Sequence, residues 1–327
     1  MFDLISVGDA TIDNFVQIHD AEVKCNIDKT QCMLCVEYGD KIPVDKLTHL
    51  VAGNAANNAV GGSRLKLKSA IYVNVGSDPA GKQISDKLKE EGVNLRYLQE
   101  NKGMESNLST VLTFQGERTI FVYHQEWKYK LPELDNAKWV YFTSIAPSFT
   151  HSNLLNELTS YLERTSAKLL YNPGTYQIKD GVKKHPRLLS LSELFIVNKE
   201  EAKRILYGKD DLDIPIKKLL KEIVDLGPRM VIITDGPEGS FGFDGEKYYK
   251  LGVFPAKLVE ATGAGDAFAT GVLSGLFYGK DLAEAMRWGA ANGASVIEQI
   301  GPQAGLLTYS QMQEKLKENS KILAREI

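Results

Sequence analysis

The chain has 327 residues, 43% of them hydrophobic and 25% charged, and its 39 basic and 42 acidic side chains give a net charge of -3. This length and apolar content allow one large α/β domain with a sizeable core. There is no basic block and no apolar run of roughly 20 residues, so we expect neither nucleic acid nor a membrane as a partner. The start MFDLISVGD has no basic stretch or cleavage site. The default expectation is a cytoplasmic enzyme.

Short apolar runs alternate with helical patterns along the chain. FDLISVGD reads as a buried strand, and GNAANNAVGGSRLKL reads as a helix with Asn54 as its cap. The later segments continue the alternation: AIYVNVG, GKQISDKLKEEGV, KWVYFTSI, SNLLNELTSYLERT, AKLLYNPG, LFIVNKEEAKRIL and MVIITDG. This order predicts βαβ units, with a mostly parallel sheet and helices on both of its faces.

Two polar, strand-like stretches interrupt the alternation. They predict a small β-sheet lid from about residues 14–46 and 100–127, with a hairpin that turns at Gln115–Glu117. An edge decoration without a function is the alternative. Near the C-terminus, GSFGFDG and EKYYKLGVFP predict a meander, and the chain from Gly263 onward predicts helices only. No linker or repeat divides the chain, so residues 1–327 are expected to form a single domain with this lid.

The three cysteines lie close together in CNIDKTQCMLC, and Cys32 and Cys35 have the C-x-x-C spacing of metal and redox sites. The five histidines show no spacing that would complete a zinc site. We therefore predict that Cys25, Cys32 and Cys35 are free thiols in a reducing compartment.

Two segments have glycines where a phosphate could bind. GSDPAGKQ lies between a predicted strand and a predicted helix, but Gln83 stands where a P-loop needs a Ser or Thr hydroxyl for magnesium. The second segment, TGAGD, places backbone amides at the start of a helix, which favours anion binding. Asp266 lies in the first turn of that helix, where the helix field is expected to lower its pKa. An ionised carboxylate at this place can accept a proton from an alcohol, although a glycine-rich helix start is the simpler interpretation.

Other segments favour the chemical interpretation. GAGDAF at 263–268 resembles the C-terminal signature of the ribokinase-like (PfkB) carbohydrate kinases, and AGNAANNAVGGSRL at 52–65 resembles their N-terminal signature. VGDATIDNF, VGSDPAG, VNKEEA and ITDGPEG also resemble family segments and follow in the family's order. The resemblance spans almost the whole chain. It implies an α/β fold, a ribokinase-like three-layer α/β/α sandwich with a mostly parallel central sheet and a small β-sheet lid.

The resemblance also implies roles for individual residues. Asp266 would be the general base, and Gly263, Ala264 and Gly265 would stabilise charge on the γ-phosphoryl group. The substrate would contact Asp13, Gly53, Asn54 and Asn57. The nucleotide would contact Asn198, Thr234, Asp235, Gly236, Gly239, Thr262 and Asn292. Glu201 would help to hold Mg²⁺, through water, so the implied cofactors are ATP and Mg²⁺.

Several of these residues also have structural interpretations. Asn198 and Glu201 have the spacing of a capping box at a helix start. Asn292 lies among small residues and could serve packing, and Asn172 precedes a proline and could serve a turn. Many relatives have Asp at the position of Glu260, where it helps to hold a monovalent cation. Activation by K⁺ is therefore left open.

The implied activity is ATP-dependent phosphorylation of a small sugar, of the ribokinase, fructokinase or ketodeoxygluconate kinase type. A phosphorylated acceptor would favour several basic residues in the lid, which offers only Arg118 and His124. A nucleoside kinase of the same family is the alternative, because Phe15, Phe114, Phe121 and Tyr123 could provide a platform for a base. A sugar- or nucleotide-binding protein without catalysis is the third interpretation. The lid strands would pair two copies into a homodimer, as in many relatives.

Overall fold

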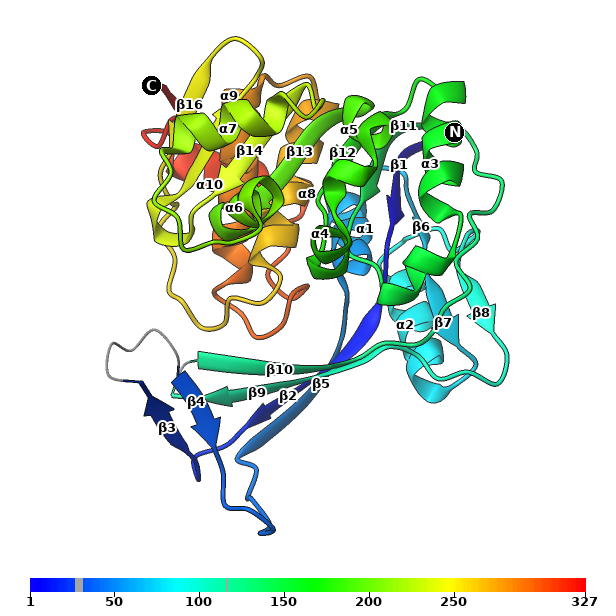
Figure 1. Cartoon of the computed structure of the whole chain (residues 1–327), viewed down its shortest axis with the longest axis vertical. Helices are drawn as coiled ribbons and strands as arrows, with labels where there is room; N and C mark the ends of the chain where they lie inside the picture. The colour runs from blue at the N-terminus through cyan, green and yellow to red at the C-terminus, as the bar shows by residue number, and fades with distance from the viewer. Residues whose placement is uncertain (27–31, 116) are drawn as a thin grey trace.

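The computed structural model describes residues 1–26, 32–115 and 117–327, and its main feature is a large twisted sheet between two layers of helices (Figure 1). Six strands of this sheet are parallel. In spatial order they are β6 (Ser69–Tyr72), β1 (Phe2–Val7), β11 (Ala137–Phe142), β12 (Lys168–Tyr171), β13 (Ser192–Asn198) and β14 (Met230–Thr234). An antiparallel extension follows, made of β15 (Ser240–Phe243), β16 (Tyr248–Leu251) and β17 (Arg325–Glu326).

Alternate strand residues pack against different helical layers. Ile5 and Val7 are buried on one face of the sheet, whereas Leu4 is buried on the other. The first face is covered by α3 (Leu154–Arg164), α4 (Thr175–Asp180), α5 (Pro186–Ser190), α6 (Lys199–Tyr207) and α7 (Ile216–Val224). The second is covered by α1 (Asn54–Arg64), α8 (Ala264–Phe277), α9 (Leu282–Val296) and α10 (Tyr309–Glu318). The predicted three-layer α/β/α fold with a mostly parallel sheet is confirmed.

The remaining elements lie at the margins of this body. AIYVNVG forms two strands, β6 and then β7 (Asn74–Gly76), which pairs with β8 (Gln99–Asn101). Helix α2 (Pro79–Glu90) packs beside β7, β2 (Thr11–Gln17) and β5 (Lys46–Ala52), and its Ile84 and Leu88 are buried in the same apolar cluster as residues of α1. Short 3₁₀ turns are η1 (Pro147–His151), η2 (Val182–Lys184) and η3 (Gly236–Glu238). The expectation of helices only after Gly263 is wrong at the C-terminus, because β17 completes the edge of the main sheet.

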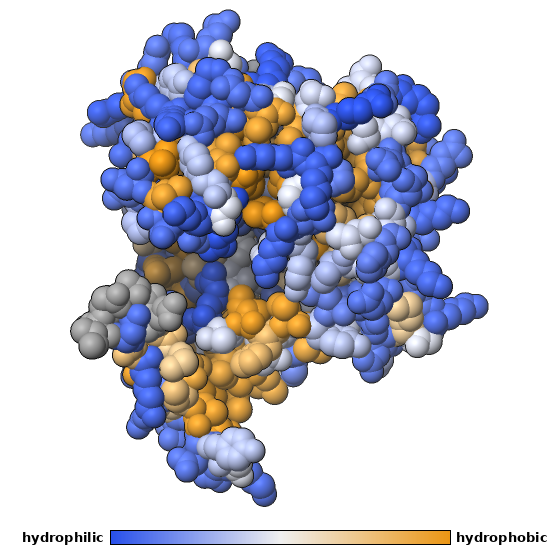
Figure 2. Space-filling view, viewed as in Figure 1, coloured by the Kyte–Doolittle hydropathy of each residue, from blue (hydrophilic) through white to orange (hydrophobic). Residues whose placement is uncertain are grey.

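A second, smaller sheet stands below the body in Figure 1. Its strands, in spatial order, are β10 (Glu117–Tyr123), β9 (Leu108–Phe114), β2 (Thr11–Gln17) and β5 (Lys46–Ala52). Apolar side chains gather on this part of the surface (Figure 2), and Leu47, Ile120, Phe121 and Val122 are exposed there. Gly116, in the predicted hairpin turn, lies outside the described residues. That this sheet closes over an active site stays a prediction.

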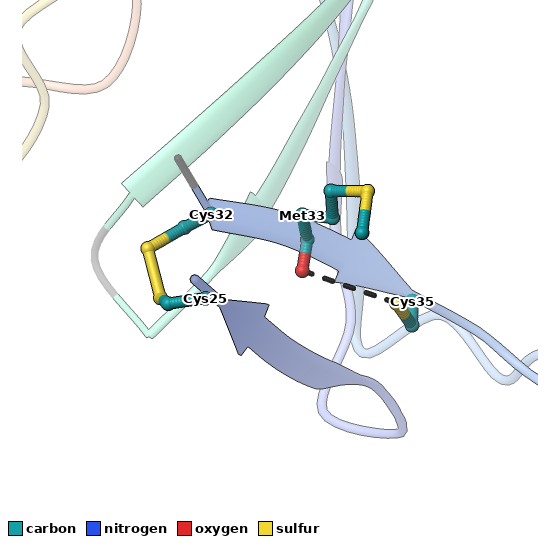
Figure 3. The surroundings of a disulfide bond; sticks show 4 residues. All are labelled: Cys25, Cys32, Met33 and Cys35. Atoms are coloured by element: carbon teal, nitrogen blue, oxygen red, sulfur yellow. Dashed lines mark hydrogen bonds between the residues drawn. A yellow bond between two sulfur atoms is a disulfide. The ribbon is translucent and has the colours of Figure 1, made fainter. Parts of the chain in front are cut away.

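The prediction of three free thiols is wrong. Strands β3 (Glu22–Cys25) and β4 (Cys32–Cys35) pair antiparallel, with Cys25 directly opposite Cys32 and 4.0 Å between their Cα atoms, and the two cysteines form a disulfide (Figure 3). Only Cys35 keeps a free thiol. Cys32 and Cys35 lie three positions apart on one strand and therefore point to opposite faces. The C-x-x-C spacing is thus not a bonding pair.

Candidate active site

Asp266 lies in the first turn of α8, where two asparagines of α1 hold its carboxylate. Asn54 Nδ2 donates to Oδ1 at 2.8 Å, and Asn57 Nδ2 donates to Oδ2 at 2.8 Å. Asn54 was expected to cap α1, but the N-cap is Gly53, and it makes no side-chain capping bond. The expected cap is wrong because the amide of Asn54 is used across the helix interface. Two sequence-predicted groups, far apart in the chain, thus meet at one carboxylate.

The pKa of Asp266 differs from the sequence expectation. Burial of the carboxyl raises its pKa, and the hydrogen bonds from Asn57 and Asn54 counteract only part of that rise. The helix start was expected to lower the pKa, so this expectation is wrong in sign. The reason is desolvation, because removing a carboxylate from water disfavours its charged form.

The turn before α8 presents backbone amides beside this carboxylate. Gly263 is the N-cap with a φ of 81°, and a Cβ at this position would lie 2.3 Å from Cβ of Pro302. The amide of Ala264 makes a long bond of 3.3 Å to the Ala261 carbonyl, whereas the first regular helix bond runs from Ala267 to Gly263. The first amides of a helix have no acceptors within it, which leaves Gly265 available to an anion. Gly265 is also exposed to solvent.

Gln303 supports this arrangement from behind and was missed by the sequence analysis. It is buried, and its Nε2 donates to Asn57 Oδ1 at 3.1 Å. Arg64 in turn donates to the Gln303 carbonyl at 2.7 Å. Both ends of the Asn57 amide are therefore used, one by Asp266 and one by Gln303. A glutamine in a loop gives no local signal of such a contact.

Asp13 lies on strand β2 of the small sheet, where the charge of Asp266 acts on it. Its side chain is buried, and Oδ1 has no hydrogen-bond partner within the described part of the chain. Burial raises its pKa to about 6, and the negative charges of Glu260 and Asp266 add to the rise. Gly53 lies beside the same strand, where a Cβ would be 2.6 Å from the Asp9 carbonyl oxygen. Asp9 itself is structural, since it accepts bonds from Tyr129 and the Ala146 amide.

A cavity of about 260 Å³ opens at the carboxyl ends of the parallel strands, which is where α/β sheets bind ligands. Several predicted residues meet around it, at the ends of β13 and β14 and at the starts of α1, α6 and α8. They are Asn54, Asn172, Asn198, Glu201, Thr234, Gly265 and Asp266. Asn172 is fixed there by a bond from the Tyr141 hydroxyl at 2.9 Å and by its own bond to the Ile196 carbonyl at 2.8 Å.

The capping box at the start of α6 is present. Asn198 Oδ1 accepts from the Glu201 amide at 2.8 Å, and Glu201 Oε2 accepts from the Asn198 amide at 2.9 Å. Burial raises the pKa of Glu201, and the bond from Asn198 opposes that rise. The interpretation of Asn198 and Glu201 as a capping box is therefore confirmed. Glu201 also lines the cavity of about 260 Å³. Its role toward Mg²⁺ stays a prediction.

The other nucleotide residues lie in different surroundings. Asp235 forms an ion pair with Lys199 at 2.7 Å, and Gly236 begins the turn η3 with a φ of 48°. Gly239 approaches the backbone of Leu251 closely, since a Cβ would lie 2.1 Å from its carbonyl oxygen. Asn292 is fully buried between α8 and the segment before α10, where it bonds to Ala267 and Leu307. Packing thus explains Asn292, and its contact with the nucleotide stays a prediction.

The loop GSDPAGKQ does not form a phosphate cradle. Asp78 is the N-cap of α2, and its carboxylate accepts bonds from the Gly81 amide and the Ser106 hydroxyl. A Cβ at Gly76 would lie 2.3 Å from the Met104 carbonyl oxygen, so this glycine allows a close approach of two backbone segments. The space that a phosphate would need is occupied by the carboxylate of Asp78.

Comparison with known proteins identifies the family. The model of the pfkB family of carbohydrate kinases matches residues 16–308. The chain belongs to this family. It is 29% identical to the ATP-dependent 6-phosphofructokinase of Thermoanaerobacterium thermosaccharolyticum over 280 residues, which cover 82% of this chain and 85% of that protein. The family resemblance expected from the sequence is confirmed, and with it a phosphotransferase of the sugar or nucleoside kinase class.

Solved structures confirm the ribokinase-like fold. Arabidopsis thaliana ribokinase, complexed with ribose and ATP, has a TM-score of 0.77 to this chain at 22% identity, covering 97% of this chain and 99% of that one. The nucleoside kinase of Methanocaldococcus jannaschii has a TM-score of 0.75 at 22% identity, with the same coverage. Among the described helices, none is long and apolar enough to cross a membrane.

Proposed function

We propose that this protein transfers the γ-phosphoryl group of ATP to a hydroxyl group of a small sugar, with Asp266 as the general base. The observation that supports this most directly is the position of the Asp266 carboxylate. It is buried at a helix start, held by Asn54 and Asn57, and adjacent to the amides of the turn that begins at Gly263. A base and an anion site are thus adjacent, as transfer to an alcohol requires.

The raised pKa of Asp266 suits this role. A carboxylate with an ordinary pKa is a weak base at neutral pH, and burial increases its affinity for the proton of an attacking hydroxyl. The two asparagine amides hold the carboxylate so that a hydroxyl approaches it in one orientation. The amides of Gly263, Ala264 and Gly265 would then stabilise the charge of the phosphoryl group in flight. Asp13, with its free buried oxygen, would bind the acceptor together with Gly53.

ATP would lie along the cavity that contains Asn198, Glu201 and Thr234, with Asp235, Gly236, Gly239, Thr262 and Asn292 as the further predicted contacts. The described residues contain no group of three or more His, Cys, Asp or Glu side chains that could hold a metal ion. This fits Mg²⁺, which keeps several waters and binds mainly to phosphates. Bound there, it would neutralise charge on the phosphates, and Glu201 would orient its waters.

A monovalent cation could bind at Glu260, where Oε2 is buried without a partner among the described residues. The other oxygen of this carboxylate already accepts bonds from Thr262. Arg118 already pairs with Glu260 at 3.3 Å, so a K⁺ ion would bind only weakly, at the orphaned oxygen and against the charge of the guanidinium. Comparing rates in K⁺ and in a large organic cation at equal ionic strength tests whether this site matters.

The acceptor would lie between the small sheet and the body. A cavity of about 670 Å³ there is lined by Phe15, Phe114, Lys46 and Arg118, among others, but not by Asp13 or Asp266, so it borders the place of the reacting hydroxyl. The cavity lining has few basic side chains, which favours a free sugar over a phosphorylated one, although one relative is an ATP-dependent 6-phosphofructokinase. Phe15 and Phe114 keep a nucleoside as the second candidate. Phe121 and Tyr123 are exposed and lie on the face of β10 opposite to Arg118. They therefore give less support to a platform for a nucleoside base.

We also propose that the protein is a homodimer that pairs through the small sheet. A cytoplasmic location stays a prediction, and the disulfide between Cys25 and Cys32 argues against it, because reducing compartments rarely keep disulfides. Phe121 is 61% exposed and Leu47 is 55% exposed, which leaves apolar surface for a second copy (Figure 2). Among the described strands, β10 is at the edge of the small sheet, and edge strands present backbone groups that can pair between chains. Sedimentation at several concentrations tests the dimer separately from activity.

The decisive experiment measures ATP consumption with a panel of pentoses, hexoses, hexose phosphates, keto-sugar acids and nucleosides. The expected result is fast turnover with one free sugar and none in the Asp266→Asn variant. Preference for a nucleoside would select the second candidate. Absence of turnover with every acceptor, in protein that still binds ATP, would overturn the proposal in favour of a binding protein.

A further inference from the structure

Glu260 stands at the entrance to the turn that begins α8. Its side chain is only 10% exposed, and Oε1 accepts from the Thr262 amide at 2.7 Å and from the Thr262 hydroxyl at 2.5 Å. These two bonds fix the backbone immediately before Gly263. The direction of the helix-start amides therefore depends on the position of this carboxylate.

Arg118 reaches the same carboxylate from the other side of the cleft. It lies on β10, the edge strand of the small sheet, and its Nη1 is 3.3 Å from Glu260 Oε1. The guanidinium is 38% exposed. Arg118 and Glu260 both line the cavity of about 670 Å³ between the small sheet and the body. One ion pair thus joins the part of the molecule that would cover the acceptor to the turn that would hold the phosphoryl group.

The carboxylates near Glu260 make the positive charge of Arg118 important at this place. Asp13 lies close enough to Glu260 and Asp266 for both negative charges to raise the pKa of Asp13. A buried carboxylate without a cation is strongly destabilised, and Arg118 provides a positive charge at this place. If the small sheet moved away, Glu260 would lose that charge and keep only its bonds to Thr262. The turn would then be free to rearrange.

We propose that Arg118 is a positioning residue that couples closure of the small sheet over the acceptor to the arrangement of the amides at the start of α8, through Glu260. The proposal rests on the kinase function argued above. It assigns to the small sheet a part in the phosphoryl transfer step, in addition to binding the acceptor. Without the ion pair, the acceptor would still bind, but the amides would be misplaced for part of the time.

Steady-state kinetics on the full chain separate this role from a direct contact with the acceptor. Arg118→Gln is expected to lower kcat roughly 10-fold, which corresponds to about 1.4 kcal/mol, with little change in the KM for the acceptor. Arg118→Lys should restore part of the rate. Arg118→Gln should add nothing to Glu260→Gln in the double variant, since coupled residues are not additive. Arg96→Gln is the matched control, because it removes a surface arginine that pairs with Asp135.

Hydrogen exchange gives a readout that does not need turnover. Amides of residues 262–266 are expected to exchange faster in Arg118→Gln than in the wild type, and to be unchanged in Arg96→Gln. A raised acceptor KM with unchanged kcat, additive effects in the double variant, or unchanged exchange would each overturn the proposal. If the wild type phosphorylates no acceptor, the kinase function fails, and the exchange rates still decide whether Arg118 fixes the turn.

Discussion

Nearly every residue of β11 and β14 in the main sheet is buried, whereas every residue of β10 in the small sheet is exposed. The groups proposed for the chemistry follow the same division. Asp266, Asn54 and Asn57 are fixed to one another in the body, while Asp13 and Arg118 belong to the small sheet. On the proposed roles, the body holds the reacting groups, whereas the small sheet binds the acceptor through Asp13 and adjusts the turn before α8 through Arg118. Changes in the two regions should therefore have different signatures.

The largest effect is expected from the body, in Asp266→Asn. The amide has no affinity for the hydroxyl proton, so kcat should fall about 10²–10⁴-fold. The fold should persist because the Asn side chain has the same size, although one of the amides of Asn54 and Asn57 loses its acceptor, which costs about 1–3 kcal/mol. Initial rates and a melting curve measure the two effects. Undiminished turnover in a folded variant would remove Asp266 from the role of base.

Changes in the small sheet should have a different effect, and Asp13→Asn tests this. The pKa of Asp13 is raised from 3.8 to about 6 in the folded protein, so its ionisation opposes folding, and stability is lost as pH rises through that range. A shift of this size corresponds to about 3 kcal/mol. The variant should therefore be more stable than the wild type by up to about 3 kcal/mol at pH 8, with almost no gain at pH 3, and it should bind the acceptor poorly.

Denaturant unfolding at the two pH values measures this gain. Asp20→Asn, which makes the same substitution at an exposed position, is the control. A variant that is no more stable than the wild type at pH 8 would show that the buried Asp13 carboxylate does not oppose folding. A stabilised variant with unchanged acceptor KM would keep the electrostatic account and remove the binding role.

A smaller effect is expected from Gln303→Leu, which tests the support behind Asp266 in the body. The variant leaves Asn57 Oδ1 without its donor, and losing a buried partner costs about 1–3 kcal/mol. We expect kcat to fall roughly 10-fold because Asn57 no longer holds the carboxylate in one position. Gln99→Leu, which removes a bond to the Tyr97 carbonyl elsewhere, is the control. A loss confined to stability, with kcat preserved, would make Gln303 a purely structural residue.

The sequence predicted local features better than contacts across the fold. The order of strands and helices, the signature at Asp266 and the family follow from local patterns, because each lies in a contiguous segment. Contacts across the fold do not follow from local patterns. Asn57 and Asp266 are 209 residues apart, so neither their hydrogen bond nor the burial that raises the pKa of Asp266 could be foreseen. Gln303 was missed for the same reason. The pairing of Cys25 with Cys32 depends on the register of two strands, which the spacing alone leaves open.

The smallest effect is expected from that disulfide. A disulfide typically stabilises a protein by about 2–4 kcal/mol when the linked segment unfolds with the rest. Here β3 and β4 form a separate two-stranded sheet with exposed or partly exposed residues, so the hairpin can open by itself. Cys25→Ser should therefore leave kcat and the melting temperature nearly unchanged. Alkylation of the unfolded wild type without reductant should label Cys35 alone. Labelling of all three cysteines would show that the disulfide does not form, and a large loss of stability would show that the hairpin is part of the body's cooperative unit.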